Sequence, residues 1–426
     1  VGMLDTFFNR RSTWGGPRPY PEIKRVAGTI PPMGYAFLNL DDGVPADDLK
    51  AEGDTIENAH YRVRIDRKTG AIAELYDKAQ GHDFAGKYQG WGPGEYIYET
   101  VDHPDDRLKI ADISFDNPEF FTGHKDTPWR RETATKVTLE DATIYEGRAS
   151  ITVKIEAPGV SGATVVYALD ADTKAVAIDW TIDKLDHPNA EAVFIAFPFN
   201  LKSADFLLDL NGIPAVPNRD QLDGAAKDWY PVGRWASVSD GERNVTVVPL
   251  DAPLAHLGGI TTGKWNRTLQ PEGPTIMSWA LNNHWLVNFK SSQSGRIPLR
   301  YRLTTGTGPA DAAAATRFAL EQAVPPVAMR DIAPTGKRSD SYFSTGSAPV
   351  LVTTKPGEDK GWVVLRVQNL SNEPQTQTVT FTGQPAAARA ADPVEHVGAP
   401  LALDGQTLSV DVKPLEIRTV LVRFAH

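Results

Sequence analysis

The densest group of side chains suited to sugar recognition lies between positions 256 and 296. An indole face packs on the apolar side of a pyranose, while amides and guanidinium groups bond hydroxyls in fixed directions. Such groups are costly to bury unpaired, so the window predicts a wet cleft, a domain interface or ordinary strand structure. Its candidates for sugar contact are Trp265, Asn266, Arg267, Asn282, Asn283, His284 and Trp285.

A second candidate segment spans residues 127–132. Trp129 offers a stacking surface, and the guanidinium of Arg130 can fork onto two neighbouring hydroxyls. The alternative is a surface strand whose charges pair with one another. Both interpretations stay open from the sequence.

Carboxylates and histidines give no comparable constellation. The chain has 54 acidic residues, so neighbouring pairs such as Glu95 and Glu99 arise by chance, and we assign no catalytic carboxylate. Two His-x-Asp pairs, at 103–105 and 124–126, fall in turn-like segments. We therefore expect no metal site in this chain.

The composition of the chain limits the classes of binding partner that we expect. The 426 residues carry a net charge of −10, which disfavours nucleic acid and fits a neutral glycan better. Cysteine is absent, so thiol nucleophiles and disulfides are excluded. No apolar run reaches the roughly 18 residues of a membrane helix, so we expect a soluble protein without a membrane partner. The compartment, bacterial periplasm or cytoplasm, stays open.

Hydrophobic periodicity indicates an all-β chain. Residues 60–66 alternate with period two, residues 67–70 form a turn, and residues 71–76 return as a second strand. The same pattern recurs along most of the chain and predicts antiparallel sheets, with one short helix at 311–322. We expect four segments: an extended lead-in at 1–50, a large super-sandwich at 51–305, a connection with the helix at 306–348, and a small β domain at 349–426.

Several short motifs, in order, resemble the C-terminal β region of glycoside hydrolase family 38, the α-mannosidases, in a bacterial branch. The opening one reads Glu57-Asn58, strand, Thr69-Gly70, strand, Asp77-Lys78. The others are segments 30–35, 191–199, 251–254, 282–285 and 414–419. The resemblance implies a galactose-mutarotase-like super-sandwich followed by a small C-terminal β-sandwich.

The resemblance also implies a division of labour. Family members carry zinc and the nucleophile in an N-terminal catalytic domain, which we expect to be absent from this chain and to be its partner. The β portion would pack on that domain and complete the sugar cleft for a mannoside-like glycan. A loop in those enzymes offers a tyrosine hydroxyl to the sugar, which implies this role for Tyr96, with Glu99 in the same segment. Simple packing of Tyr96 and Tyr98 in a strand is the alternative.

Two further hypotheses remain from the residues. A stand-alone polysaccharide lyase or sugar epimerase would need acid and base groups, for which His256, His284, Tyr96 and Arg267 are candidates. A non-catalytic carbohydrate-binding module would need only the aromatic and amide groups.

Overall fold

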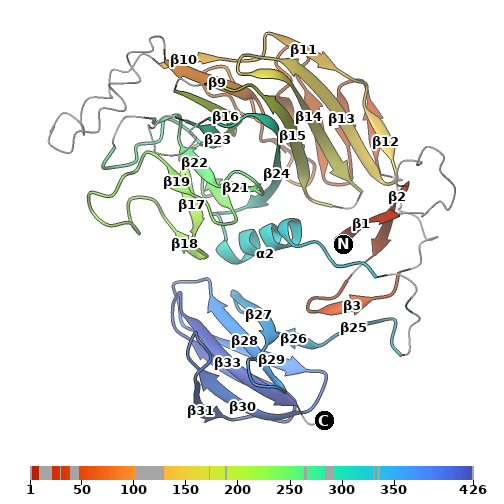
Figure 1. Ribbon diagram of the computed structural model, residues 1–426, viewed down its shortest axis with the longest axis vertical. Helices are drawn as coiled ribbons and strands as arrows, with labels where there is room; N and C mark the ends of the chain where they lie inside the picture. Colours follow the sequence, from red (N-terminus) through yellow and green to blue (C-terminus); the bar gives the residue numbers. More distant parts are fainter. Residues whose placement is uncertain are drawn as a thin grey trace. The chain divides into compact units, whose positions relative to one another are not determined.

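The computed structural model describes residues 30–38, 48–101, 129–171, 173–187, 190–262, 266–283, 292–329, 332 and 336–424, with backbone alone for 2–8 and 22–28. The chain forms two compact units (Figure 1). The larger unit is Val44–Ala310 with Phe318–Ala323, and the smaller is Val1–Gly43, Asp311–Arg317 and Val324–His426. The four-segment division stays a prediction, and the units cut across it because residues 1–43 group with residues after 324.

The ten-stranded sheet of the larger unit runs in the order β11-β13-β14-β15-β24-β21-β20-β17-β18, with β12 beside β13. Alternation explains its core side: Ala149, Ile151, Val153 and Ile155 of β13 are buried, with partly exposed residues between them. Its strands are β11 Lys136–Leu139, β12 Thr143–Tyr145, β13 Arg148–Glu156, β14 Val160–Asp170, β15 Val176–Lys184, β17 Asp205–Leu210, β18 Ile213–Ala215, β20 Ala236–Ser239, β21 Arg243–Pro249 and β24 Gly295–Thr307.

A six-stranded sheet, ordered β10-β9-β16-β23-β22-β19, packs on the ten-stranded one. Its inner face meets that sheet through Phe197, whose ring centroid lies 5.0 Å from that of Tyr301, and through the Ser278 hydroxyl, 2.9 Å from the Tyr301 hydroxyl. We call the opposite side the outer face. The strands are β9 Tyr96–Val101, β10 Trp129–Glu132, β16 Glu191–Pro198, β19 Tyr230–Pro231, β22 Leu254–Leu257 and β23 Thr275–Asn282. Every position of β16 is buried, as its continuous apolar run indicates.

A third sheet in the larger unit follows chain order, β4-β5-β6-β7-β8. The β6–β7 turn places Gly70 at φ 75°, where an added Cβ would lie 3.0 Å from Val153. The Tyr167 hydroxyl donates to the Gly70 carbonyl at 2.8 Å, which ties this sheet to the ten-stranded one. The strands are β4 Lys50–Glu52, β5 Thr55–Glu57, β6 Tyr61–Ile65, β7 Ile72–Asp77 and β8 His82–Asp83.

The smaller unit contains a β-sandwich with a core of its own. Three strands, β26-β29-β32, pack on five, β27-β28-β33-β30-β31. Val367, Val379, Leu408 and Val422 are fully buried between them. The strands are β26 Phe343–Thr345, β27 Val350–Pro356, β28 Trp362–Asn369, β29 Gln375–Phe381, β30 Pro385–Ala391, β31 Val397–Leu401, β32 Thr407–Val412 and β33 Ile417–Phe424.

The remaining elements are two short ladders and a helix. β1 (Gly2–Phe8) pairs antiparallel with β2 (Glu22–Gly28). β3 (Gly34–Ala36) pairs with β25 (Ser339–Ser341), so residues far apart in sequence are joined. The helix α2 (Ala312–Ala323) begins after Asp311, whose carboxylate accepts the Ala314 N–H at 2.6 Å as an N-cap.

The predicted fold class is confirmed: the described chain is built almost wholly of antiparallel sheets, with one helix near 311–322 and a small C-terminal β-sandwich. Among the described residues, no helix has the length and apolarity that crossing a bilayer requires.

Candidate functional site

The strand register places four side chains in one row across the outer face of the six-stranded sheet. Arg131 on β10 lies opposite Glu99 on β9, Glu99 opposite Ala192 on β16, and Ala192 opposite Asn282 on β23. Directly opposed residues share a face, so the Glu99 carboxylate and the Asn282 amide flank the small Ala192, and the Arg131 cation lies beyond Glu99. A hollow of about 40 Å³ lies at this end of β16 and β23; Ala192 and Asn282 border it, as do Lys184 of β15 and Glu191.

The two members of the Arg131–Glu99 ion pair differ in burial. The Arg131 Nε donates to Glu99 Oε2 at 2.7 Å, with the Glu99 side chain 0% exposed and the Arg131 side chain 23% exposed. Burial raises the pKa of Glu99, and the Arg131 charge and the Thr262 hydroxyl act in the opposite direction. The carboxylate is thus a buried support that holds a partly exposed guanidinium in place.

Aromatic rings form the next row of the outer face. Phe194 lies opposite Trp279, and their rings are nearly parallel with centroids 6.1 Å apart. The Trp229 ring centroid lies 5.5 Å from that of Trp279, and Trp229 is the half-buried member of the group. Phe194 and Trp279 are buried, so the half-buried Trp229 is the ring of these three that offers indole surface beside the fixed polar groups.

The loop after β22 closes one end of this face and fixes a histidine. The Thr261 N–H donates to His256 Nδ1 at 3.0 Å, and the Thr261 hydroxyl donates to the Asp228 carbonyl. His256 Nδ1 is therefore an acceptor, which leaves the ring proton on Nε2 in the neutral form. His256 is fully buried, so it is a structural part of the face rather than a free acid or base.

A tyrosine–carboxylate pair lies at the same end. The Tyr88 hydroxyl donates to Glu272 Oε2 at 2.6 Å. Burial and the neighbouring Glu272 raise the pKa of Tyr88 to about 12, and the charge of Arg131 opposes this shift. Arg131 is thus close enough to influence both this pair and Glu99.

Three residues predicted from the sequence lie on or beside the outer face: Glu99, Asn282 and Trp129. Trp129 lies opposite Val101, two positions from Arg131 on β10, and so shares its face. Arg130 points to the other side, is exposed, and donates to Glu132 Oε2 at 2.6 Å. Arg131 is not among the sugar contacts predicted from the sequence, although the alternation of β10 places it on the same face as Trp129.

Tyr96 and Asn283 serve the interior instead. Tyr96 is 2% exposed, and its hydroxyl donates to the Pro158 carbonyl at 2.8 Å. The strand alternation that directs Glu99 outward directs Tyr96 inward, so the position differs from a sugar ligand's and matches the packing alternative. The Asn283 side chain accepts the Glu191 N–H at 2.6 Å and donates to the His187 carbonyl at 3.0 Å.

The other predicted residues are peripheral or undescribed. Asn266 is held by its backbone, whose N–H donates to Asp228 Oδ1 at 2.8 Å, and Arg267 is exposed. Trp265, His284 and Trp285 lie outside the described residues, as do both His-x-Asp pairs.

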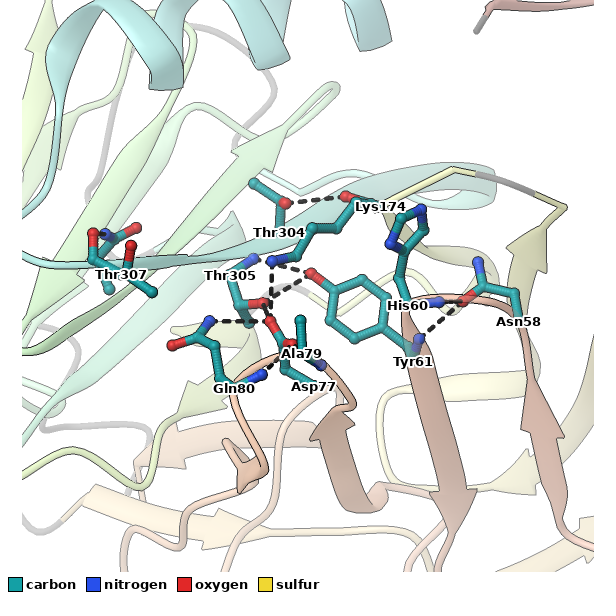
Figure 2. A network of polar contacts seen from close by, with 11 residues as sticks. Asn58, His60, Tyr61, Asp77, Ala79, Gln80, Lys174, Thr304, Thr305 and Thr307 are labelled. Atoms are coloured by element: carbon teal, nitrogen blue, oxygen red, sulfur yellow. Dashed lines mark hydrogen bonds and ion pairs between the residues drawn. The ribbon is translucent and has the colours of Figure 1, made fainter.

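The Glu-Asn and Asp-Lys motif forms a separate polar network (Figure 2). The Tyr61 hydroxyl lies 2.8 Å from Thr305 Oγ1, which donates to Asp77 Oδ2 at 2.6 Å. Lys174 Nζ lies 2.9 Å from the same carboxylate oxygen, and Gln80 donates to it at 2.9 Å. Burial raises the pKa of Asp77, but these hydrogen bonds outweigh it and lower the value to about 2.

This network is structural. The Asn58 side chain donates to the Asp170 carbonyl at 2.8 Å and the Thr173 carbonyl at 2.9 Å, while its Oδ1 accepts the Tyr61 N–H at 2.8 Å. Its members come from the five-stranded sheet, from β24 and from the loop before β15, as Figure 2 shows. The motif therefore joins sheets, and the sugar-facing candidates are those of the outer face.

Models of known protein families match two parts of the chain, one in the larger unit and one in the C-terminal β-sandwich. The model described as "Glycosyl hydrolases family 38 C-terminal domain" matches residues 56–252. The model described as "Glycosyl hydrolases family 38 C-terminal beta sandwich domain" matches residues 348–420. Together they span well over half of the chain. The chain belongs to the C-terminal region of glycosyl hydrolase family 38. The family 38 motif residues Asn58 and Asp77 thus have a role in the fold.

Solved structures show the same fold for this family 38 chain. An α-mannosidase from Enterococcus faecalis is 15% identical, with a TM-score of 0.61 over 88% of this chain and 42% of that one. A family 38 protein from Enterococcus faecalis is 14% identical, with a TM-score of 0.65 over 100% of this chain and 52% of that one. The chain thus spans about half the length of these relatives. No curated protein matched it significantly.

Proposed function

We propose that this family 38 chain is the β portion of an α-mannosidase-like glycoside hydrolase. In this proposal the outer face of the six-stranded sheet forms one side of a cleft for a neutral, mannoside-like glycan. The family match and the likeness to family 38 structures support the assignment to this class of enzyme.

The observation that carries the proposal is the row Arg131, Glu99, Ala192 and Asn282. A guanidinium held by a buried carboxylate loses little freedom when it bonds a hydroxyl, and Asn282 offers both a donor and an acceptor. The half-buried Trp229 supplies apolar surface in the adjoining part of the face, where it packs on the buried ring of Trp279. A pyranose presents hydroxyls and an apolar C–H face together, which is what this combination recognises.

The catalytic step belongs to a partner domain in this proposal, and zinc belongs there with it. Within the described ranges no three histidine or carboxylate side chains gather closely enough to hold a metal ion, so these residues do not fit a zinc site. We derive no catalytic step from this chain's own residues.

Binding of a mannoside to the purified chain tests the outer face. We expect saturation-transfer NMR to detect methyl α-D-mannopyranoside, and the Arg131→Gln variant to bind it about tenfold more weakly, because a charged hydrogen-bond donor contributes roughly 1.5–3 kcal/mol. The matched control is Arg130→Gln, one residue away on the other side of the strand, which should leave affinity unchanged.

Loss of the partner of a buried carboxylate could disturb the fold, so a double variant completes the design. Glu99→Gln with Arg131→Gln removes both charges and keeps a hydrogen-bonding pair. If it unfolds like the parent chain yet binds as tightly, or if Arg130→Gln weakens binding equally, the outer face is not the sugar site.

An activity assay tests the division of labour separately. We expect the chain alone to release no nitrophenol from 4-nitrophenyl α-D-mannopyranoside, with or without added zinc. Zinc-dependent turnover that survives repurification would contradict the assignment of catalysis to a partner domain, whatever the binding result.

A further inference from the structure

The β-sandwich of the smaller unit carries a hollow that the proposed cleft does not use. Its volume is about 360 Å³, within the range of roughly 300–1,000 Å³ typical of small-molecule sites. The walls come from the start of β29, the end of β32 and the turn that leads into β33. The polar lining residues are Gln375, Thr376, Asp411, Lys413, Glu416 and Arg418.

One buried side chain holds both walls of this hollow in place. Asn369 is 0% exposed, and its amide donates to the Glu373 carbonyl at 2.7 Å and to the Lys413 carbonyl at 3.0 Å. The first carbonyl precedes the β29 wall, and the second belongs to the turn after β32. The hollow is therefore fixed by the fold before any ligand arrives, which lowers the entropic cost of binding.

The acidic groups of the lining are also fixed. Asp411 Oδ1 accepts the Thr376 hydroxyl at 2.6 Å, and Glu416 Oε2 accepts the Lys413 N–H at 2.7 Å. Each of these bonds engages one carboxylate oxygen. Among the described residues, Asp411 Oδ2 and Glu416 Oε1 have no hydrogen-bond donor, so an acceptor remains on each.

Cationic donors complete the set. Arg418 Nη1 donates to the Asp411 carbonyl at 2.8 Å, which positions the guanidinium against the carboxylate wall. Lys413 is exposed at the same turn. Two acidic and two basic groups balance in charge, which disfavours a polyanion or a polycation and favours a neutral ligand.

We infer that this hollow of the C-terminal β-sandwich is an accessory binding site for a neutral saccharide. Each saccharide hydroxyl is both a donor and an acceptor, so it suits carboxylate oxygens beside guanidinium, ammonium and amide groups. The exposed Pro374 adds apolar surface for ring C–H groups. The inference stands apart from the proposed cleft, because no residue of the six-stranded sheet takes part in it.

The test is an NMR titration of the isotope-labelled full chain. Maltotriose and methyl α-D-mannopyranoside are the neutral probes, and glucuronic acid is the anionic counterpart. We expect saturable shifts of the Thr376, Lys413 and Arg418 amides with the neutral probes, with dissociation constants in the millimolar range, and at least fivefold weaker binding of glucuronic acid.

A double variant and a control make the result specific. Asp411→Asn with Glu416→Gln keeps the acceptors for Thr376 and Lys413 and removes the charges, and should weaken saccharide binding at least fivefold at these amides. Glu358→Gln, an exposed acid of the same sandwich, should leave binding unchanged.

Three outcomes would overturn the inference: no shift at these amides with 50 mM probe, shifts indifferent to the double variant, or stronger binding of glucuronic acid than of the neutral probes. Because the shifts are read at named amides, they can be lost while binding at Arg131 persists, or the reverse. Failure here is thus distinguishable from failure of the proposed cleft.

Discussion

At the residue scale, the Asp77 carboxylate makes stability depend on pH. Its pKa is lowered from 3.8 to about 2, so the folded state releases this proton more readily than the unfolded state. The resulting stabilisation is present above about pH 4 and is lost as pH falls through about 2, and it amounts to about 2 kcal/mol. We expect Asp77→Asn to lower the free energy of unfolding by about 2–3 kcal/mol at pH 7, since the amide would direct a donor at Lys174 and Thr305.

Urea unfolding of the variant and the parent chain between pH 7 and pH 2 checks this prediction. The difference between them should shrink steadily below pH 4. Asp205→Asn is the control, because Asp205 is an exposed acid at the start of a strand and should change little at any pH. A difference that stays constant down to pH 2 would show that the Asp77 charge does not stabilise the fold.

At the element scale, the turn of the β13–β14 hairpin packs closely against the six-stranded sheet at Gly159. Its φ is 79°, and an added Cβ would lie 2.3 Å from the Tyr98 ring. The Tyr98 hydroxyl donates to Glu191, which also accepts from the buried Lys184 at 2.6 Å. We expect Gly159→Ala to destabilise the chain by more than about 3 kcal/mol, because backbone strain adds to the clash with the ring and displaces a partner of a buried ion pair.

Gly241→Ala separates strain from clash. Gly241 also lies in a hairpin turn at φ 83°, but an added Cβ meets no atom within 4 Å. We expect it to cost only about 1–2 kcal/mol, the strain alone. Equal losses in the two variants, measured by chemical unfolding, would mean that packing of the hairpin on Tyr98 contributes nothing.

At the scale of the whole molecule, the segment after α2 is the natural place for a protease to divide the chain. Val324, Val327 and Met329 are 66%, 86% and 73% exposed. The sandwich beyond it has a buried core of its own, so we expect it to stay folded after such a cut. We expect brief thermolysin treatment to cut near Met329 first and to leave a stable C-terminal fragment, identified by mass spectrometry. Met329→Ser should slow that cut, and early cuts within 349–424 would contradict the prediction.

The sequence predicted the elements better than the site. Strands such as β6 and β13 alternate cleanly between apolar and polar residues, so their positions follow from local pattern. The outer face depends on which residues stand opposite one another across strands distant in sequence. Ala192 and Glu99 are neighbours only through the register of β16 and β9, and no local pattern encodes that register.

The same distinction explains Tyr96 and Arg131. Aromatic and basic residues made β9 and β10 candidates for sugar contact. Whether Tyr96 or Glu99, and Arg130 or Arg131, lies on the outer face depends on which side of each strand faces the ten-stranded sheet. Alternation allows either set of side chains to face inward. The contacts of Tyr96 with Trp180 and of Phe197 with Tyr301 show which set does so.

The ladder between β3 and β25 has a consequence for synthesis of the chain. Its first strand leaves the ribosome about 300 residues before its partner Ser339–Ser341. At roughly 5–20 residues per second, Gly34–Ala36 must stay unpaired for about 15–60 s. The larger unit lies between them in sequence and can complete its sheets during that interval. Translation order therefore makes the smaller unit close after the larger one, and pauses before the codon for Ser339 would lengthen exposure of an early strand edge.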